Sequence, residues 1–278
     1  MQPMRSTLAG RALVVMLAAV MLMSLPGATS AADLDAAPTI APPSLEVALA
    51  SLLPAAGPVV DDEAVDGEFS TAAKLPACEV KDIPTRFGKA RQWKKTLLDT
   101  NLKLRRTYKP WDLVSVSRAN IKGSGKVRKI MIADLKALAR AARKAGKPLA
   151  VRSSYRSYDY QKALFASYVR TNGYAQALKF SARPGHSEHQ MGTTIDFTTA
   201  PGVPLSTRFG DSPAGKWLAR NGWKYGFIMS YPKGKKSASC YIYEPWHWRY
   251  FGREVARQIH ESGQVPRRYL WQNHESAS

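Results

Sequence analysis

Two short segments of this chain hold the residue types that a catalytic metal site needs. The first runs from Pro184 to Asp196 and includes His189, and the second runs from Glu244 to His247. Together they supply two imidazoles, one ligating carboxylate and one spare carboxylate, which suits a zinc site with an open position for water. We expect His189, Asp196 and His247 to bind Zn²⁺ and Glu244 to act as the general base beside it.

The spacing of these residues allows them to converge on one centre. The two ligands of the first segment are seven residues apart, and Gly192 between them lets the chain turn and continue as a strand. Glu244 and His247 are three residues apart, which on a regular strand would place them on opposite faces. Pro245 cannot donate a ladder hydrogen bond, so we expect a bend that turns both side chains toward the same centre.

Helices and short strands alternate along the part of the chain that must position this site. Apolar periodicity, with glycine or a cap at the ends, predicts helices over residues 127–145, 159–171, 212–222 and 251–262. Strands are predicted over residues 148–153, 193–198, 226–230 and 239–243. In the second strand Ile195 and Phe197 share one face, and Asp196 points to the other. This mixture indicates an α+β fold, with a small antiparallel sheet and flanking helices.

The first 76 residues differ in composition from the rest. Residues 1–31 carry two arginines, an apolar run of twelve residues and then small residues, which is typical of a signal peptide. An uncleaved N-terminal anchor is the alternative. Residues 32–76 hold eight acidic residues against one lysine and are rich in Ala and Pro, which predicts a disordered linker. We expect an exported protein with one domain over residues 77–278 and no transmembrane segment after the signal is removed.

The predicted domain is strongly basic. The whole chain has a net charge of +20, and setting aside +2 for residues 1–31 and −7 for residues 32–76 leaves +25. Outside the cytoplasm such a surface would bind anionic cell-wall polymers or anionic lipid headgroups, and a merely solvated basic exterior is the alternative. We expect the wall polymers to be the partner. No nucleic-acid-binding motif accompanies the basic clusters, so we expect no specific nucleic-acid partner.

The chain contains two cysteines, Cys78 and Cys240. Because an exported protein meets an oxidising environment, we expect a disulfide between them. Two free buried thiols are the alternative. The sequence does not supply the distance that decides between them.

Four ordered blocks of sequence carry a resemblance to a known family. They are Arg152 to Gln161, Arg183 to Asp196, Gly226 to Pro232 and Glu244 to Tyr250. In order and spacing they resemble the VanY-type D-alanyl-D-alanine carboxypeptidase family, which comprises zinc peptidases of bacterial peptidoglycan with the Hedgehog/DD-peptidase fold. The resemblance covers roughly residues 130–255 and extends upstream through Thr96 to Thr100 and Pro110 to Leu113.

The resemblance implies a role for individual residues. His189, Asp196 and His247 match the metal ligands, and Glu244 matches the catalytic base. Arg156 matches an arginine that binds substrate and stabilises the oxyanion, for which a planar, permanently charged guanidinium is suited. The positions that match the pocket for the D-alanine end are Gln161, Ser187, Tyr231 and Trp246.

Simpler interpretations exist for several of these residues and for the remaining histidines. Tyr231 and Trp246 could be core aromatics, and Gln161 could sit on an exposed helix face. We expect His186 to be structural or to support the ligands. The two histidines of the terminal region, at positions 260 and 274, are expected on the surface.

The signal peptide and the basic charge predict a secreted, wall-associated enzyme, which we expect to be monomeric, and the resemblance implies that it cuts the peptidoglycan stem peptide at its D-alanine end. An L,D-carboxypeptidase or a peptidoglycan endopeptidase would use the same site on a different bond. A non-catalytic, zinc-containing wall-binding module is the alternative from another class, and an intact Glu244 and Arg156 argue against it because mere binding needs neither. Nitrogen and oxygen ligands also leave several divalent metals open.

Overall fold

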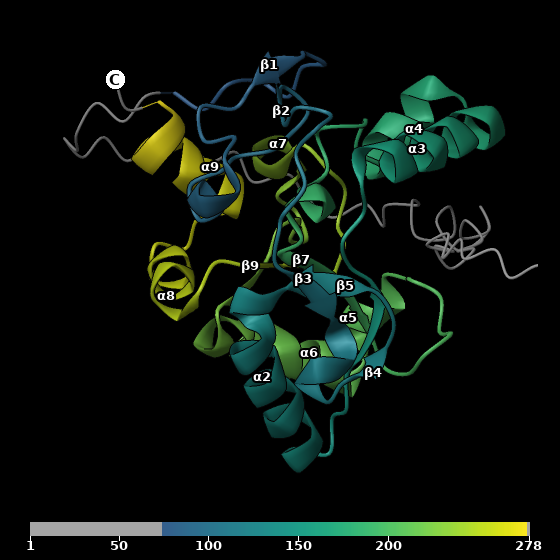
Figure 1. Ribbon diagram of the computed structural model, residues 1–278, viewed down its shortest axis with the longest axis vertical. Helices are drawn as coiled ribbons and strands as arrows, with labels where there is room; N and C mark the ends of the chain where they lie inside the picture. Colours follow the sequence, from purple (N-terminus) through teal and green to yellow (C-terminus); the bar gives the residue numbers. More distant parts are fainter. Residues whose placement is uncertain (1–73, 277–278) are drawn as a thin grey trace, which may run out of the picture. The chain divides into compact units, whose positions relative to one another are not determined.

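The structure, a computed structural model, describes residues 74–276 (Figure 1). The predicted signal peptide, and the predicted linker except for its last three residues, lie outside this range. Among the described residues, no helix combines the length and apolar character needed to cross a membrane.

The described strands are short and form three sheets. Their bounds are β1 (Ile83–Pro84), β2 (Leu102–Lys103), β3 (Leu113–Ser115), β4 (Lys122–Gly123), β5 (Lys126–Arg128), β6 (Ala150–Ser153), β7 (Thr194–Thr198), β8 (Phe227–Met229) and β9 (His247–Tyr250). The largest sheet has the order β4-β6-β7-β9-β8, and the other two are pairs, β1-β2 and β3-β5. Within the largest sheet only the edge pair β4-β6 is parallel, so the predicted antiparallel sheet is right for its other strands.

Helices flank this sheet and give the expected α+β architecture. Their bounds are α2 (Ile132–Lys144), α3 (Tyr158–Asn172), α4 (Tyr174–Phe180), α5 (Arg208–Asp211), α6 (Pro213–Asn221), α7 (Lys236–Ser239), α8 (Arg253–Glu261) and α9 (Pro266–Leu270). A short 3₁₀ segment, η4 (Glu188–Met191), leads into β7.

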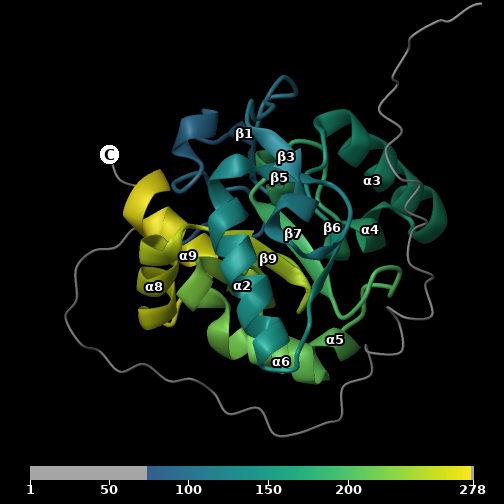
Figure 2. The same ribbon diagram turned by 60° about the horizontal axis from the view of Figure 1, so that its bottom comes forward.

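The main core lies between one face of the sheet and the helices α2 and α6 (Figure 2). Ile195 and Phe197 of β7 are fully buried there, against Leu135 and Leu138 of α2 and Leu218 of α6. Alternation along β7 therefore directs Asp196 to the opposite face, as the sequence predicts. The apolar side of the sheet anchors the strand, and its polar side is free to carry a site.

Three predicted elements differ from the structure. Helix α2 begins at Ile132 and not at residue 127, because residues 126–128 pair with β3 as strand β5. Helix α3 begins at Tyr158 and not at residue 159, because its N-cap is Ser157, whose Oγ accepts the backbone N–H of Tyr160 at 3.1 Å. Residues 239–243 do not form a strand, because α7 occupies residues 236–239 and Cys240 ends it with a left-handed φ of 71°.

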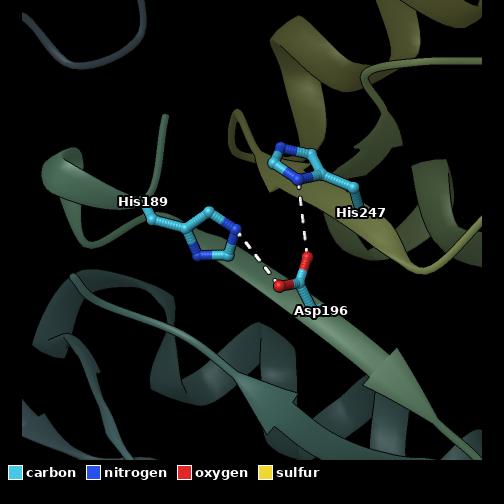
Figure 3. Close-up of side chains that lie close together, drawn as sticks. All are labelled: His189, Asp196 and His247. Atoms are coloured by element: carbon cyan, nitrogen blue, oxygen red, sulfur yellow. Dashed lines mark ion pairs between the residues drawn. The ribbon is translucent and has the colours of Figure 1, made fainter. Parts of the chain in front are cut away.

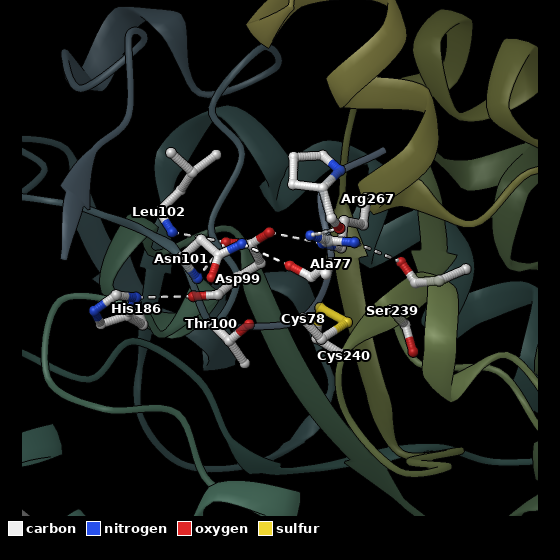
Figure 4. Close-up of polar contacts among 12 residues, drawn as sticks. Ala77, Cys78, Asp99, Thr100, Asn101, Leu102, His186, Ser239, Cys240 and Arg267 are labelled. Carbon is white, nitrogen blue, oxygen red and sulfur yellow. Dashed lines mark hydrogen bonds and ion pairs between the residues drawn. A yellow bond between two sulfur atoms is a disulfide. The ribbon is translucent and has the colours of Figure 1, made fainter. Parts of the chain in front are cut away.

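The predicted disulfide between Cys78 and Cys240 is present (Figure 4). It joins the first described segment to the end of α7. A buried ion pair supports the same region, since Arg267 Nε donates to Asp99 Oδ2 at 2.6 Å and Arg267 Nη2 donates to the carbonyl of Pro76 at 3.0 Å. The start of the described chain is thus fastened to residues far along the sequence.

Candidate metal centre and active site

The three predicted metal ligands converge on one buried point (Figure 3). His189 comes from η4, Asp196 from the middle of β7, and His247 from the start of β9. Strand register brings the last two together, because Asp196 and His247 are directly paired across β7 and β9. Donor atoms of the three residues lie within 4.8 Å of one another.

The donor set has unsatisfied buried atoms that a metal ion would complete. His189 Nδ1 donates to the carbonyl of Ser154 at 2.6 Å, so Nε2 is the nitrogen left with a lone pair. Neither His189 Nε2 nor Asp196 Oδ1 has a hydrogen-bond partner among the described residues, although both are buried. Burial, reinforced by the positive charge of Arg156, lowers the pKa of His189 to about 4 and keeps its ring neutral. Two imidazoles and a carboxylate around such a gap fit zinc.

Glu244 lies next to this group but is not part of it. Residues 245 and 246 form a turn, and the backbone N–H of His247 donates to the carbonyl of Glu244 at 3.1 Å, which is the predicted bend. Glu244 Oε2 lies 3.5 Å from His247 Nδ1. Burial raises the pKa of Glu244 to about 8, so this carboxyl can both accept and release a proton near neutral pH.

A pocket of about 160 Å³ opens beside Glu244 and contains every residue that the sequence predicts for substrate binding. Its lining includes Arg156, Gln161, Ser187, Tyr231 and Trp246, together with Asp196, Glu244 and His247. The Nε atom of the arginine is buried without a hydrogen-bond partner among the described residues.

The simpler interpretations of Gln161 and Tyr231, as an exposed helix residue and a core aromatic residue, can be tested against their places in this pocket. Gln161 is 1% exposed and donates from Nε2 to the carbonyl of Ala182 at 2.7 Å, so it does not sit on an exposed helix face. Its Oε1 is buried without a described partner. The ring of Tyr231 packs 4.6 Å from the His247 ring, so this aromatic residue is buried and also borders the pocket.

Sequence reasoning missed the residues behind His247. Glu188 accepts hydrogen bonds from His247 Nε2 at 2.9 Å, from Ser230 Oγ at 2.6 Å and from Arg249 Nη1 at 2.9 Å. Burial opposes ionisation of Glu188, but the charge of Arg249 and the contacts with His247 and Ser230 together outweigh it and lower the pKa to about 2. Arg249 follows His247 by two residues on one strand, so the two share a face, and that pattern could have signalled the group.

Three further pocket-lining residues, on the second half of α3 and on α4, also went unpredicted. They are Tyr168, Asn172 and Phe180. Nothing in their types distinguishes them from ordinary helix residues.

The other described histidines are not part of the candidate ligand group. His186 is 1% exposed and contacts the carbonyl of Asp99 at 2.8 Å and Asp82 Oδ1 at 2.9 Å, as expected of a structural residue. His260 is exposed and stacks on Trp223 at 4.3 Å. His274 is only partly exposed, because it packs against Phe87, so the expectation of a surface position is right for one of the two.

Comparisons with known proteins agree with this geometry. The sequence profile of VanY, described as D-alanyl-D-alanine carboxypeptidase, matches residues 124–253. A solved structure of the LD-carboxypeptidase LdcB is 35% identical, has a TM-score of 0.59, and covers 64% of this chain and 87% of its own. This chain belongs to the VanY carboxypeptidase family. Its fold is the Hedgehog-like peptidase fold of these proteins, as the resemblance implies.

Other similar proteins agree with this assignment. VanYB, solved in complex with D-alanine-D-alanine, is 27% identical with a TM-score of 0.55, and the match covers 65% of this chain and 99% of that one. YodJ of Bacillus subtilis is 42% identical over 161 residues, which are 56% of this chain and 59% of YodJ. A D-alanyl-D-alanine carboxypeptidase of Enterococcus faecalis is 34% identical over 139 residues, 47% of this chain and 50% of that protein. This chain thus spans about half the length of these two curated relatives.

Proposed function

We propose that this protein is an exported zinc peptidase that removes the terminal D-alanine from peptidoglycan stem peptides. Family membership makes it a relative of carboxypeptidases, and the metal, the bond and the place of action are the proposal. The observation that carries it is the convergence of the three ligand side chains, two of which, Asp196 and His247, line a pocket that Glu244 and Arg156 also line.

Zinc fits the donor set of His189, Asp196 and His247, and when bound it supplies Lewis acidity and makes a water acidic enough to lose a proton near neutral pH. A VanY structure solved with Zn(II) supports this choice of metal. The ligands are preorganised without it, because the Ser154 carbonyl orients His189 and Glu188 orients His247. Little reorganisation is then needed when the ion binds.

Glu244 takes the proton of the attacking water and delivers it to the leaving amine of the released D-alanine. Its burial supports this role, since a carboxyl with a pKa of about 8 is a stronger base than an exposed glutamate. Arg156 stabilises the negative charge that develops on the carbonyl oxygen of the bond being cut. A module that only binds the wall would need neither group.

The D-alanine end fits the pocket lined by Gln161, Ser187, Tyr231 and Trp246. The free Oε1 of Gln161 can accept an N–H, and the aromatic rings limit the space for a small side chain. This assignment is supported by VanYB, whose structure holds D-alanine-D-alanine.

One observation favours a second candidate, cleavage of D-alanine from a shortened stem as an L,D-carboxypeptidase. LdcB, named as an LD-carboxypeptidase, is more similar to this chain than VanYB in both identity and TM-score. The same groups would perform either cut, because the leaving D-alanine is identical and only the preceding residue differs.

Defined tri-, tetra- and pentapeptide stems, incubated with purified protein and zinc, test the proposal. We expect the pentapeptide to lose one D-alanine, read by the product mass. Loss of D-alanine from the tetrapeptide alone would identify the L,D-carboxypeptidase instead. An internal cut would identify an endopeptidase, and intact peptides in all three reactions would refute the proposed activity.

The metal assignment has its own test. His247→Ala removes one of three ligands, so the variant should lose zinc and activity together. Bound zinc per protein chain, measured by elemental analysis, should be close to one for the wild type and close to zero for the variant. Full zinc occupancy in the variant would refute the ligand assignment.

A further inference from the structure

Glu188 lies behind His247, on the side of the ring opposite to the candidate metal position. His247 Nε2 donates to Glu188 Oε2 at 2.9 Å, whereas His247 Nδ1 faces Asp196 Oδ1 at 3.4 Å. The two nitrogens of an imidazole are distinct, and a hydrogen bond at one selects the other as the metal ligand. The carboxylate of Glu188 therefore directs Nδ1, with its lone pair, toward the centre.

The contacts of Glu188 hold its carboxylate in place. Oε2 also accepts the hydroxyl of Ser230 at 2.6 Å, and Oε1 accepts Arg249 Nη1 at 2.9 Å. Glu188 is 4% exposed, and Ser230 is 3% exposed. With both oxygens engaged by three protein donors, this group is built to orient a side chain and not to react.

Arg249 extends this support to a distant part of the chain. It is completely buried, and its Nη2 donates to the carbonyls of Trp93 at 2.9 Å and Thr96 at 2.7 Å. Its guanidinium also lies 4.4 Å from the ring of Phe251. The two carbonyls precede the family match at residues 124–253, so residues outside that match help to place Glu188.

We infer that Glu188 is a positioning residue, which fixes the orientation of His247 for metal binding and is itself fixed by Ser230 and Arg249. The inference rests on the proposed function, because it concerns the proposed zinc ligand. It differs from a purely structural role in what it predicts. Loss of the Glu188 contact should reduce the free energy of zinc binding by more than it reduces the free energy of unfolding of the metal-free protein.

The test is the zinc dissociation constant of purified full-length variants, measured by competition with a chelating dye after metal removal. Glu188→Gln keeps the shape of the side chain but removes its charge, and we expect zinc binding to weaken about 10- to 100-fold. Ser230→Ala keeps both buried charges and removes only one hydrogen bond to Glu188. It should also weaken zinc binding, but by a smaller factor. This variant therefore tests the positioning role of Glu188 even if Glu188→Gln does not fold.

Asp99→Asn is the matched control (Figure 4). Asp99 is also buried, at 2% exposure, and also pairs with a buried arginine, Arg267, at 2.6 Å. Within the described residues no hydrogen bond or ion pair links its carboxylate to the three zinc ligands. Its substitution should lower the melting temperature of the metal-free protein and leave the zinc dissociation constant at the wild-type value.

The possible results separate the two proposals. Absence of zinc binding by the wild type would refute the proposed function and this inference with it. Wild-type zinc affinity in Ser230→Ala and Glu188→Gln would refute the positioning role alone. Equal weakening of zinc binding by Asp99→Asn and Glu188→Gln would also refute it, since loss of stability would then account for both.

Discussion

The carboxyl group of Glu244 is the proposed base. Gln has the same shape but a neutral amide that cannot accept the proton, so Glu244→Gln should fold, bind zinc at one per chain and lose turnover by about 10²–10⁴-fold. Product mass from the stem peptide and elemental analysis of zinc measure the two quantities. A variant that cleaves at the wild-type rate would show that the mechanism is wrong.

Arg156 offers a planar guanidinium to the same pocket, and its buried Nε lacks a partner among the described residues. Lysine keeps the charge but presents it as a point, without the paired donors. Arg156→Lys should therefore slow peptide cleavage on the order of 10²-fold, the cost typical of losing one oxyanion donor. Steady-state kinetics on the cleaved stem would measure the loss, and an unchanged rate would remove Arg156 from the mechanism.

Among the elements, the pairing of β7 with β9 matters most to the site. Asp196 and His247 meet because they are opposite in register, while Ile195 and Trp248 face the core. Since side chains alternate along a strand, a slip of one residue would turn either ligand into the apolar core. Burial of the neighbouring side chains thus fixes the position of the ligands.

The disulfide acts on another element, the loop between α7 and Glu244. Cys240 lies four residues before Glu244, and its bridge to Cys78 closes a loop with a sequence separation of 162. Chain entropy would assign such a bridge about 5 kcal/mol of stability, and measured values are often smaller. We predict no titratable thiol in the unfolded, unreduced wild type and a lower melting temperature for the Cys78→Ser, Cys240→Ser double variant. Two free thiols, or an unchanged melting temperature, would contradict this.

At the scale of the whole molecule, the main feature is the large net positive charge of the predicted domain. Residues 77–278 carry +25 with only 13 acidic residues. Charges on an exposed surface are screened beyond about 8 Å at physiological salt. We predict that binding to anionic cell wall weakens steeply as salt rises, while cleavage of a short soluble peptide changes little. Sedimentation with purified wall across a salt series, beside the peptide assay, measures both.

Arg156→Lys is the internal control for this prediction, because it preserves the net charge. The variant should sediment with the wall like the wild type while its cleavage is impaired. Wall binding that does not depend on salt would refute the electrostatic interpretation.

How far sequence alone predicts the fold differs between elements. Strand alternation in β7 and the capped helix α6 are local patterns, and both predictions are confirmed. The helix predicted from residue 127 begins five residues later because pairing with β3 outweighs local helical periodicity over residues 126–128. A strand was expected before Glu244, and α7 occupies the start of that range because short apolar runs do not distinguish strand from helix.

The sequence by itself determined which groups the proposed chemistry uses, because imidazole and carboxylate types at short spacing within two segments are visible without any fold. Tertiary structure alone decided what supports them. Glu188 meets Ser230 across 42 residues and Arg249 across 61. No local pattern connects residues so far apart, since their contact depends on how β8, β9 and η4 pack together. The proposed reacting groups can be identified from composition and spacing, whereas their orientation follows from burial and register.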